Sequence, residues 1–334
     1  MNLIEEILGC RSVSVVGLDK NTGKTESLNW ILGRVNELGV CVGVTSIGVD
    51  GECKDQVFST HKPEIELSSG TLFATSESHY LSRRLGSEVV AMPEIRTSLG
   101  RLVIGNVVER GKIILSGAPD TVSTREVIDL MNSLGAQTVL VDGALGRRST
   151  ASPAVTDGMV LATGAAVSAN LSTMIAKTLY VCRQISLPVW SGEFWSEDIR
   201  GVRFFDTQSA CEANPEIGST LELKSLDKRW FEQYDTMYVS GAITDGVLER
   251  VSANIGSRGL RLVIPDFTHL FVEQRVMDRF ESSGGAVYVQ RRPRLLAVTV
   301  NPTSPSGYRF DSSVVVERLS EKLDCKVFDV KRLC

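Results

Sequence analysis

The sequence predicts an α/β protein in which a doubly wound, mostly parallel sheet is followed by a second, smaller α/β domain. Two observations favour this class. Short apolar runs rich in β-branched residues alternate with segments whose apolar residues recur at helical spacing. The 334 residues also exceed the usual size of one domain, and 43% hydrophobic with 23% charged residues is typical of a globular chain. We therefore expect one domain over residues 1–188 and another over 189–334.

The most informative stretch is the loop between the first strand and the helix after it. Val13–Val16 predicts a buried strand, and Glu26–Leu38 carries apolar residues at helical spacing. Between them the chain reads Gly17-Leu18-Asp19-Lys20-Asn21-Thr22-Gly23-Lys24-Thr25. A strand, a loop with a glycine at each end, Gly-Lys-Thr and a helix form the context of a phosphate-binding P-loop. The alternative, a chance Gly-Lys-Thr in a surface turn, does not explain the flanking strand and helix.

The residue types in this loop suit a nucleotide polyphosphate. A glycine at position 23 lets the backbone approach phosphate oxygens, and the helix N-terminus supplies partial positive charge. Lys24 is expected to reach the β- and γ-phosphates, and the Thr25 hydroxyl to bind Mg²⁺. The predicted nucleotide-binding residues are Gly17, Asp19, Asn21, Thr22, Gly23, Lys24 and Thr25.

A second stretch supplies a carboxylate at a strand end. The apolar run Gln137–Val141 closes in Asp142, followed by glycines. P-loop proteins need a carboxylate at such a position to hold Mg²⁺ directly or through water. By itself Asp142 would be read as a strand-end turn residue. Together with the upstream loop it is the predicted magnesium ligand, acting with Lys24 in hydrolysis.

Asp50 is a further candidate. It follows the strand predicted over Val40–Ile47, in a loop at the carboxyl edge of the sheet, where ligands of doubly wound sheets bind. Asp50 is placed there to orient water or to help hold Mg²⁺. A plain turn aspartate before glycine explains the residue equally well.

The remaining elements continue the alternation. In the first domain we expect helices at 3–9, 76–85, 121–134 and 171–185, and strands at 64–67, 70–75, 89–92, 100–108, 112–116 and 157–163. Thr121 or Ser123 is expected to cap the third of these helices. In the second domain we expect strands at 237–239, 260–264, 286–289, 295–300 and 326–330, and helices at 245–256, 269–282 and 312–323. The guanine-reading Asn-Lys-x-Asp motif is absent from the sequence, and the choice between adenine and guanine stays open.

Composition argues against several classes of protein. The net charge is −4 and no basic stripe is visible, so nucleic acid is not the expected partner. Seven cysteines without CxxC spacing fit neither a disulfide framework nor a zinc site, and a reducing cytoplasm is expected. The N-terminus is amphipathic and acidic, unlike a signal peptide, and no apolar run approaches the roughly 18–20 residues of a membrane span.

The loop departs from the usual spacing in a particular way. Leu18 stands where the first glycine normally lies, and Asp19 is the third loop residue. This arrangement resembles the loop of the dethiobiotin synthetase branch of P-loop proteins, which has one inserted residue and an aspartate at that place. Asp142-Gly143-Ala144-Leu145-Gly146 is similar to that branch's strand-closing Glu-Gly-Ala-Gly-Gly. The lysine that closes strand two in the synthetase has no counterpart, since Ser46-Ile47 stand there.

Over most of its length the chain resembles a bacterial family, the KamB-type reactivase subunits encoded with lysine aminomutases. The similar segments are the N-terminal helix and loop, Thr45–Glu52, Val141–Ala144, Ser152–Val155, Val239–Ala242 and Val300–Pro302. The resemblance implies a protein that uses Mg-ATP. With a MutS-related partner subunit, it would restore a cobalamin- and pyridoxal-phosphate-dependent aminomutase whose cobalamin has been inactivated. A homodimer is also compatible, because dimers are common in this P-loop branch.

Two other functions stay open. A small-molecule ligase or kinase of the synthetase type would hydrolyse ATP faster with a metabolite than with a protein. A non-catalytic scaffold would hold partners with a vestigial nucleotide site.

Overall fold

The computed structural model describes residues 3–47, 65–144, 155–192, 200–209, 211–225 and 227–332. The chain divides into two compact units, each described here by itself. Unit 1 comprises Met1–Leu179 and Pro293–Cys334, and unit 2 comprises Tyr180–Arg292. This division differs from the expected domains 1–188 and 189–334, because the last forty or so residues belong to the first unit.

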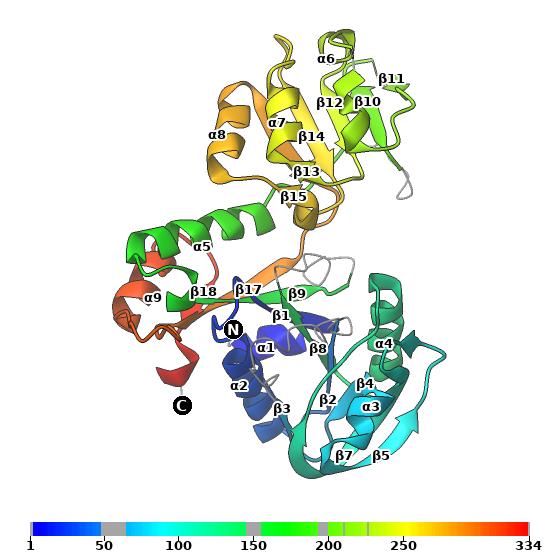
Figure 1. The fold of residues 1–334 in the computed structure, drawn as a ribbon, viewed down its shortest axis with the longest axis vertical. Coiled ribbons are helices and arrows are strands. Elements are labelled where there is room, and N and C mark those ends of the chain that lie inside the picture. Colours follow the sequence, from blue (N-terminus) through cyan, green and yellow to red (C-terminus); the bar gives the residue numbers. More distant parts are fainter. Residues whose placement is uncertain are drawn as a thin grey trace. The chain divides into compact units, whose positions relative to one another are not determined.

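Unit 1 is built on a large, mostly parallel mixed sheet, as the sequence predicts for an α/β protein (Figure 1). Its strands follow the order β18-β17-β9-β1-β8-β2-β4-β7-β3. The parallel part consists of β1 (Ser12–Gly17), β2 (Val42–Ser46), β8 (Thr138–Ala144), β9 (Gly158–Gly164), β17 (Arg294–Asn301), β18 (Lys326–Phe328) and β4 (Leu72–Ser76). Strands buried on both faces are expected to be continuous apolar runs, and β1 and β9 are buried along their whole length.

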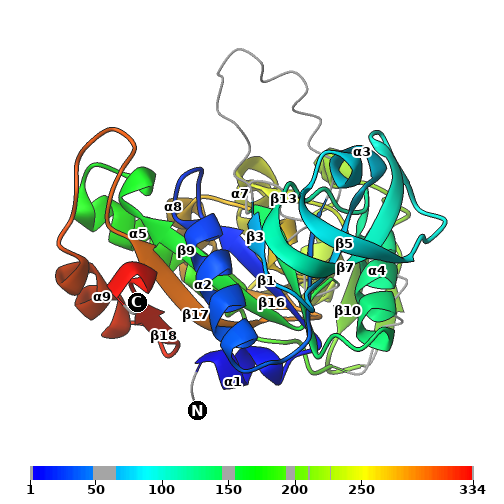
Figure 2. The same cartoon turned by 90° about the horizontal axis from the view of Figure 1, so that it is seen from below.

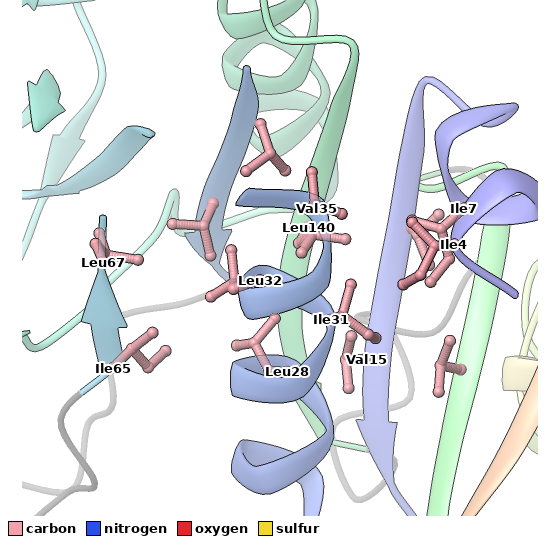
Figure 3. Packing of buried hydrophobic residues seen from close by; sticks show 14 of the residues in the cluster. Ile4, Ile7, Val15, Leu28, Ile31, Leu32, Val35, Ile65, Leu67 and Leu140 are labelled. Carbon is pink, nitrogen blue, oxygen red and sulfur yellow. The ribbon is translucent and has the colours of Figure 1, made fainter. Parts of the chain in front are cut away.

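Helices cover both faces of this sheet. On one face α1 (Leu3–Leu8) and α2 (Lys24–Glu37) pack into a single apolar cluster with side chains of β1 and β8 (Figures 2 and 3). Leu28, Ile31 and Val35 recur at helical spacing in α2, and they lie toward Val15 and Leu140 of the sheet (Figure 3). On the other face α4 (Thr121–Ser133) packs against the alternate β8 residues. Helices therefore pack on both faces of the sheet, and the loop between β1 and α2 lies at its centre.

The outer part of the sheet is antiparallel, and here the expected elements differ. The predicted helix 76–85 is only α3 (Glu77–Leu81), and Arg84–Ala91 forms β5 instead. The two strands expected at 100–108 and 112–116 are one long strand, β7 (Gly100–Ile113), which pairs with β4, β5, β6 (Arg96–Thr97) and β3 (Ile65–Leu67). At Gly111 the β5 strand approaches closely, since a Cβ there would lie 2.0 Å from the Arg84 carbonyl oxygen.

The N-terminal cap of α4 differs from the expected one. Asp120, rather than Thr121 or Ser123, caps α4, because its carboxylate accepts the Ser123 backbone N–H at 2.8 Å. α5 runs over Leu171–Ile185, as predicted, and the chain passes from unit 1 to unit 2 within it. A short 3₁₀ turn at Ala165–Val167 precedes it.

Unit 2 is a smaller sheet of five strands in the order β11-β10-β12-β14-β16 (Figure 1). Its strands are β10 (Val202–Asp206), β11 (Cys211–Ala213), β12 (Thr236–Val239), β14 (Leu260–Ile264) and β16 (Gly285–Val289). Helices α6 (Arg229–Gln233), α7 (Asp245–Ser252) and α8 (Gln274–Ser282) contribute to one apolar cluster on one face. The predicted helix 269–282 begins later, because Phe267–His269 is a 3₁₀ turn and Leu270–Phe271 forms β15, paired with β13 (Ile243–Thr244).

The segment after unit 2 returns to the first sheet. β17 pairs in parallel with β9 over its whole length, ending with Asn301 beside Gly164. α9 (Ser312–Ser320) and β18 follow, and a 3₁₀ turn at Val330–Arg332 closes the described chain. Strand 295–300 is therefore part of unit 1 and not of the second domain in which we expected it. Among the described residues, no helix combines the length and the hydropathy needed to cross a bilayer.

Candidate functional site

The loop between β1 and α2 has the backbone shape of a tight cradle. Gly23 has φ of 89°, and Asn21 has φ of 62°, in the left-handed region that non-glycine residues avoid. A Cβ on Gly17 would lie 2.8 Å from the Thr22 hydroxyl oxygen, so glycine is required where the loop leaves the strand. Both predicted loop glycines therefore have a steric reason, and α2 begins directly after the second.

Two side chains expected to bind nucleotide are used inside the loop. The buried Thr22 hydroxyl donates to the Asp19 carbonyl oxygen at 2.9 Å, and the Asp19 carboxylate accepts the Lys20 N–H at 2.7 Å. Both are local hydrogen bonds between a side chain and the backbone nearby, of the kind that stabilises turns. Thr22 and Asp19 thus shape the loop, and their main-chain groups, rather than these side chains, are the candidates for phosphate contact.

Lys24 and Asp142 come together across the carboxyl edge of the sheet. The Lys24 ammonium lies 3.0 Å from Oδ1 of Asp142, with the lysine side chain 26% and the aspartate side chain 13% exposed. The contact is a close ion pair and not an aligned hydrogen bond, and among the described residues Oδ1 has no hydrogen-bond donor although it is shielded from solvent. A buried carboxylate oxygen of this kind is suited to a cation.

The strand order explains why these two residues meet. β1 lies between β8 and β9, and Val15 of β1 is in register with Asp142 of β8. From β1 the chain crosses toward β8 and reaches β2, whereas from the neighbouring β9 it goes through unit 2 and returns as β17 on the opposite side. A sheet whose connections diverge in this way opens a crevice at the carboxyl ends of its central strands, where ligands of open α/β sheets bind.

The neighbouring strand β2 ends in Ser46. The Ser46 hydroxyl donates to the Asp142 carbonyl oxygen at 3.2 Å, so it supports the strand that bears the carboxylate. Thr25 follows Lys24 in the first turn of α2 and is half-buried. Asp50, the third predicted catalytic residue, lies outside the described residues.

Asn301 is the site residue that the sequence did not reveal. It ends β17, and its side-chain amide donates to the Asn21 carbonyl oxygen at 3.2 Å. The polar residue after an apolar strand is visible in the sequence, but the sheet that this strand joins is not. Beside it, Gly23, Ser27, Asn301 and Asp329 line a shallow hollow on the side of the loop facing β17.

A second polar cluster lies at the same edge of the sheet, farther from the loop. Thr75, Ser76 and Ser116 are fully buried, and the Ser116 hydroxyl donates to Ser76 Oγ at 2.6 Å and lies 2.9 Å from Nδ1 of His79. The Ser76 N–H also donates to Ser116 Oγ. The Thr75 hydroxyl lies 3.3 Å from the Ser116 hydroxyl, so Ser116 links the ends of two strand segments to the imidazole of His79.

The donor set fits a magnesium nucleotide. Mg²⁺ in phosphoryl-transfer sites takes one or two carboxylates with substrate phosphates, and Asp142 with the Thr25 hydroxyl offers that combination. The glycine cradle and the start of α2 offer main-chain N–H groups to phosphate oxygens. Within the ranges that the structure describes, His, Cys, Asp and Glu form no cluster of three or more that would hold a metal without such a ligand.

Comparison with known proteins adds no relative to these observations. The chain matches no model of a known protein family, no curated protein and no solved structure.

Proposed function

We propose that this protein binds Mg-ATP at the loop between β1 and α2 and hydrolyses it to drive a change in a partner protein. The observation that carries the proposal is the Lys24–Asp142 pair, which lies at the diverging centre of a parallel sheet beside a glycine cradle. Lys24 carries the positive charge that phosphate groups require, and Asp142 carries the negative charge that Mg²⁺ requires.

The residues of the loop would act mainly by position and charge. Main-chain N–H groups from Gly23 onward would hold phosphate oxygens, and Lys24 would neutralise the β- and γ-phosphates. Asp142 and Thr25 would hold the metal, whose bound charge lowers the barrier to attack on the γ-phosphate. No covalent nucleophile is needed, because phosphoryl transfer depends chiefly on positioning and charge stabilisation.

The proposed role of ATP turnover is to reactivate a cobalamin- and pyridoxal-phosphate-dependent aminomutase together with a MutS-related partner. This part rests on the resemblance of the chain to KamB-type reactivase subunits. The separate compact unit 2, inserted between β9 and β17, supports it as the candidate partner-binding body. In the proposed cycle, the nucleotide bound in unit 1 sets the affinity of unit 2 for the partner.

A specific observation favours the alternative, a small-molecule ligase or kinase. The His79–Ser116 cluster lies at the same carboxyl edge as Asp142, with β2 between them, since Ile47 bridges Ala118 and Ser46 pairs with Asp142. Adjacent strands lie about 4.8 Å apart, so a small molecule could reach from the loop to His79. The His79 imidazole would then exchange a proton with an amine or hydroxyl group of that molecule.

Two measurements test the proposal and separate the alternatives. Mg-ATP affinity is measured by calorimetry for the unaltered protein, for Lys24→Ala and for Lys177→Ala, an exposed lysine of α5 that serves as control. Loss of binding in Lys24→Ala alone supports the site, and unchanged affinity rules the loop out. ATP turnover is then compared with the aminomutase and the MutS-related subunit, and with candidate metabolites. Stimulation by the proteins supports reactivation, stimulation by a metabolite supports the ligase or kinase, and binding without turnover supports a scaffold.

A further inference from the structure

Asn21 holds a conformation that needs outside support. Its φ of 62° is one of two positive values among non-glycine residues in the described part of the chain. A left-handed conformation is unfavourable for a residue with a Cβ, although asparagine tolerates it better than most. Such residues persist where surrounding contacts hold them. The support for Asn21 must come from groups that touch the loop.

Asn301 touches the loop at Asn21 and at Gly23. Its Nδ2 donates to the Asn21 carbonyl oxygen at 3.2 Å. Its Oδ1 accepts the Thr303 N–H at 3.2 Å, which fixes Nδ2 as the amide atom that faces the loop. The Asn301 Cβ also lies 2.8 Å from the place that a Cβ on Gly23 would occupy. Asn301 therefore packs against both loop residues that have positive φ.

The strand that carries Asn301 is itself held in place. A Cβ on Gly164 would lie 1.9 Å from the Asn301 carbonyl oxygen, so β9 and β17 approach closely at their ends. Thr299 and Ser27, both buried, share a hydrogen bond of 2.7 Å between β17 and the first turn of α2. At the start of the loop, the Leu18 N–H donates to the Ala162 carbonyl oxygen of β9, the strand between β1 and β17, at 2.8 Å. The end of β17 is thus a rigid support for the loop.

We propose that Asn301 is a positioning residue of the nucleotide site. It holds Asn21 and Gly23 in the shape that presents their N–H groups, before phosphate arrives, and it does not itself contact the γ-phosphate. A loop ordered in advance binds more tightly, because less conformational freedom is lost on binding. The inference deepens the proposed function and rests on it for its nucleotide readout.

The first test compares Mg-ATP binding by the unaltered protein, Asn301→Ala and Asn254→Ala. The Asn254 amide also donates to a backbone carbonyl, that of Arg250, but in unit 2. Loss of the Asn301 bond should weaken Mg-ATP binding about three- to tenfold, the range for one hydrogen bond. Amide hydrogen exchange in the loop of the nucleotide-free protein should become faster. Asn254→Ala should change neither quantity.

A second variant separates positioning from general damage to the fold. Glycine adopts φ of 62° without strain, so Asn21→Gly removes the need for support at that residue. The double variant Asn21→Gly/Asn301→Ala should bind Mg-ATP within about twofold of Asn21→Gly alone. If Asn301→Ala binds like the unaltered protein, or if the double variant keeps the full loss, the inference is overturned.

The two proposals fail in different ways. If the unaltered protein binds and Lys24→Ala does not, normal binding by Asn301→Ala defeats the positioning role alone. If the unaltered protein binds no nucleotide, the proposed function fails, and loop exchange still decides the positioning role. Faster exchange in Asn301→Ala supports that role, and unchanged exchange overturns it.

Discussion

The Lys24 ammonium and Oδ1 of Asp142 lie 3.0 Å apart, joining the first residue of α2 to the carboxyl end of β8. The two opposite charges neutralise each other at the edge where β1, β8 and β2 end. Phosphate would compete for the lysine, and a divalent cation would compete for the aspartate. A magnesium nucleotide supplies both competitors, so it can replace the pair without leaving either charge unpaired.

Asp142→Asn should separate nucleotide binding from turnover. ATP turnover is expected to fall by about 100-fold or more, because the charge that we propose to hold the metal is lost. ATP affinity in EDTA should stay the same or rise, because Lys24 is released from its ion pair. Calorimetry with EDTA and with Mg²⁺, alongside steady-state phosphate release, measures both. Asp129→Asn, at an exposed position on α4, is the control, and turnover by Asp142→Asn within threefold of it would contradict the assignment.

Gly23→Ala should damage the loop, whereas Gly33→Ala should not. Alanine at position 23 must adopt φ near 89° with its Cβ 2.8 Å from that of Asn301, which should destabilise the fold by about 2–3 kcal/mol. Gly33 lies exposed in the same helix with open space around it, so alanine there should stabilise by about 0.5–1 kcal/mol. Urea unfolding measures both. Equal stabilities for the two variants would show that Gly23 does not have the backbone described here.

The buried Thr163–Thr178 pair should show strong non-additivity. The Thr178 hydroxyl donates to the Met174 carbonyl oxygen, so the 2.7 Å bond between the two threonines is donated by Thr163. Thr178→Val removes that acceptor and leaves the buried Thr163 hydroxyl only the weak Met174 sulfur acceptor at 3.9 Å, which should cost about 1–3 kcal/mol. The double variant Thr163→Val/Thr178→Val should be less destabilised than the sum of the two single variants. Additive losses in urea unfolding would argue against the bond.

Unit 2 should lose stability in acid through Asp206. Hydrogen bonds from the Ser209 hydroxyl and the Arg258 guanidinium lower the pKa of Asp206 to about 2, below the value of roughly 3.9 in an unfolded chain. The folded state therefore binds this proton less readily. The stabilising contribution is fully present above pH 4, and it is lost as the pH falls from about 4 to 2.

The variant Asp206→Asn tests this pH dependence. It should be less stable than the unaltered protein at pH 5, and the difference should shrink as the pH approaches 2. Urea unfolding followed by circular dichroism over that range measures it. Asp129→Asn, which loses an exposed pair with Arg11, should show little difference at any pH. A constant difference for Asp206→Asn across the range would refute the linkage.

Local patterns predicted much of unit 1. The strand expected at Val13–Val16 is β1, the helix expected over Glu26–Leu38 is α2 (Lys24–Glu37), and the strand expected to close in Asp142 is β8. The mostly parallel character of the sheet is confirmed as well. These features depend on neighbours in the sequence, so the sequence specifies them directly. The structure brings Lys24 and Asp142 together, and their roles toward a nucleotide stay predictions.

The placement of β17 was not predictable in the same way. Its apolar run would suit a buried strand in either sheet, and only pairing with β9, far away in the sequence, decides between them. The domain boundary and the contact of Asn301 with the loop follow from that pairing. The single long strand β7 was not predicted for a related reason, because its pairing with β5, including the close approach at Gly111, joins separate segments of the chain.

The late position of β17 in the chain has a consequence for biosynthesis. On the ribosome, β1, the loop and β9 emerge well before residues 293–301, and β9 has an unpaired edge until then. All strands of the unit 2 sheet and its apolar cluster have been synthesised by Val289, before β17 of unit 1 is made. The contact between Asn301 and the loop should therefore form late in synthesis, when β17 joins β9.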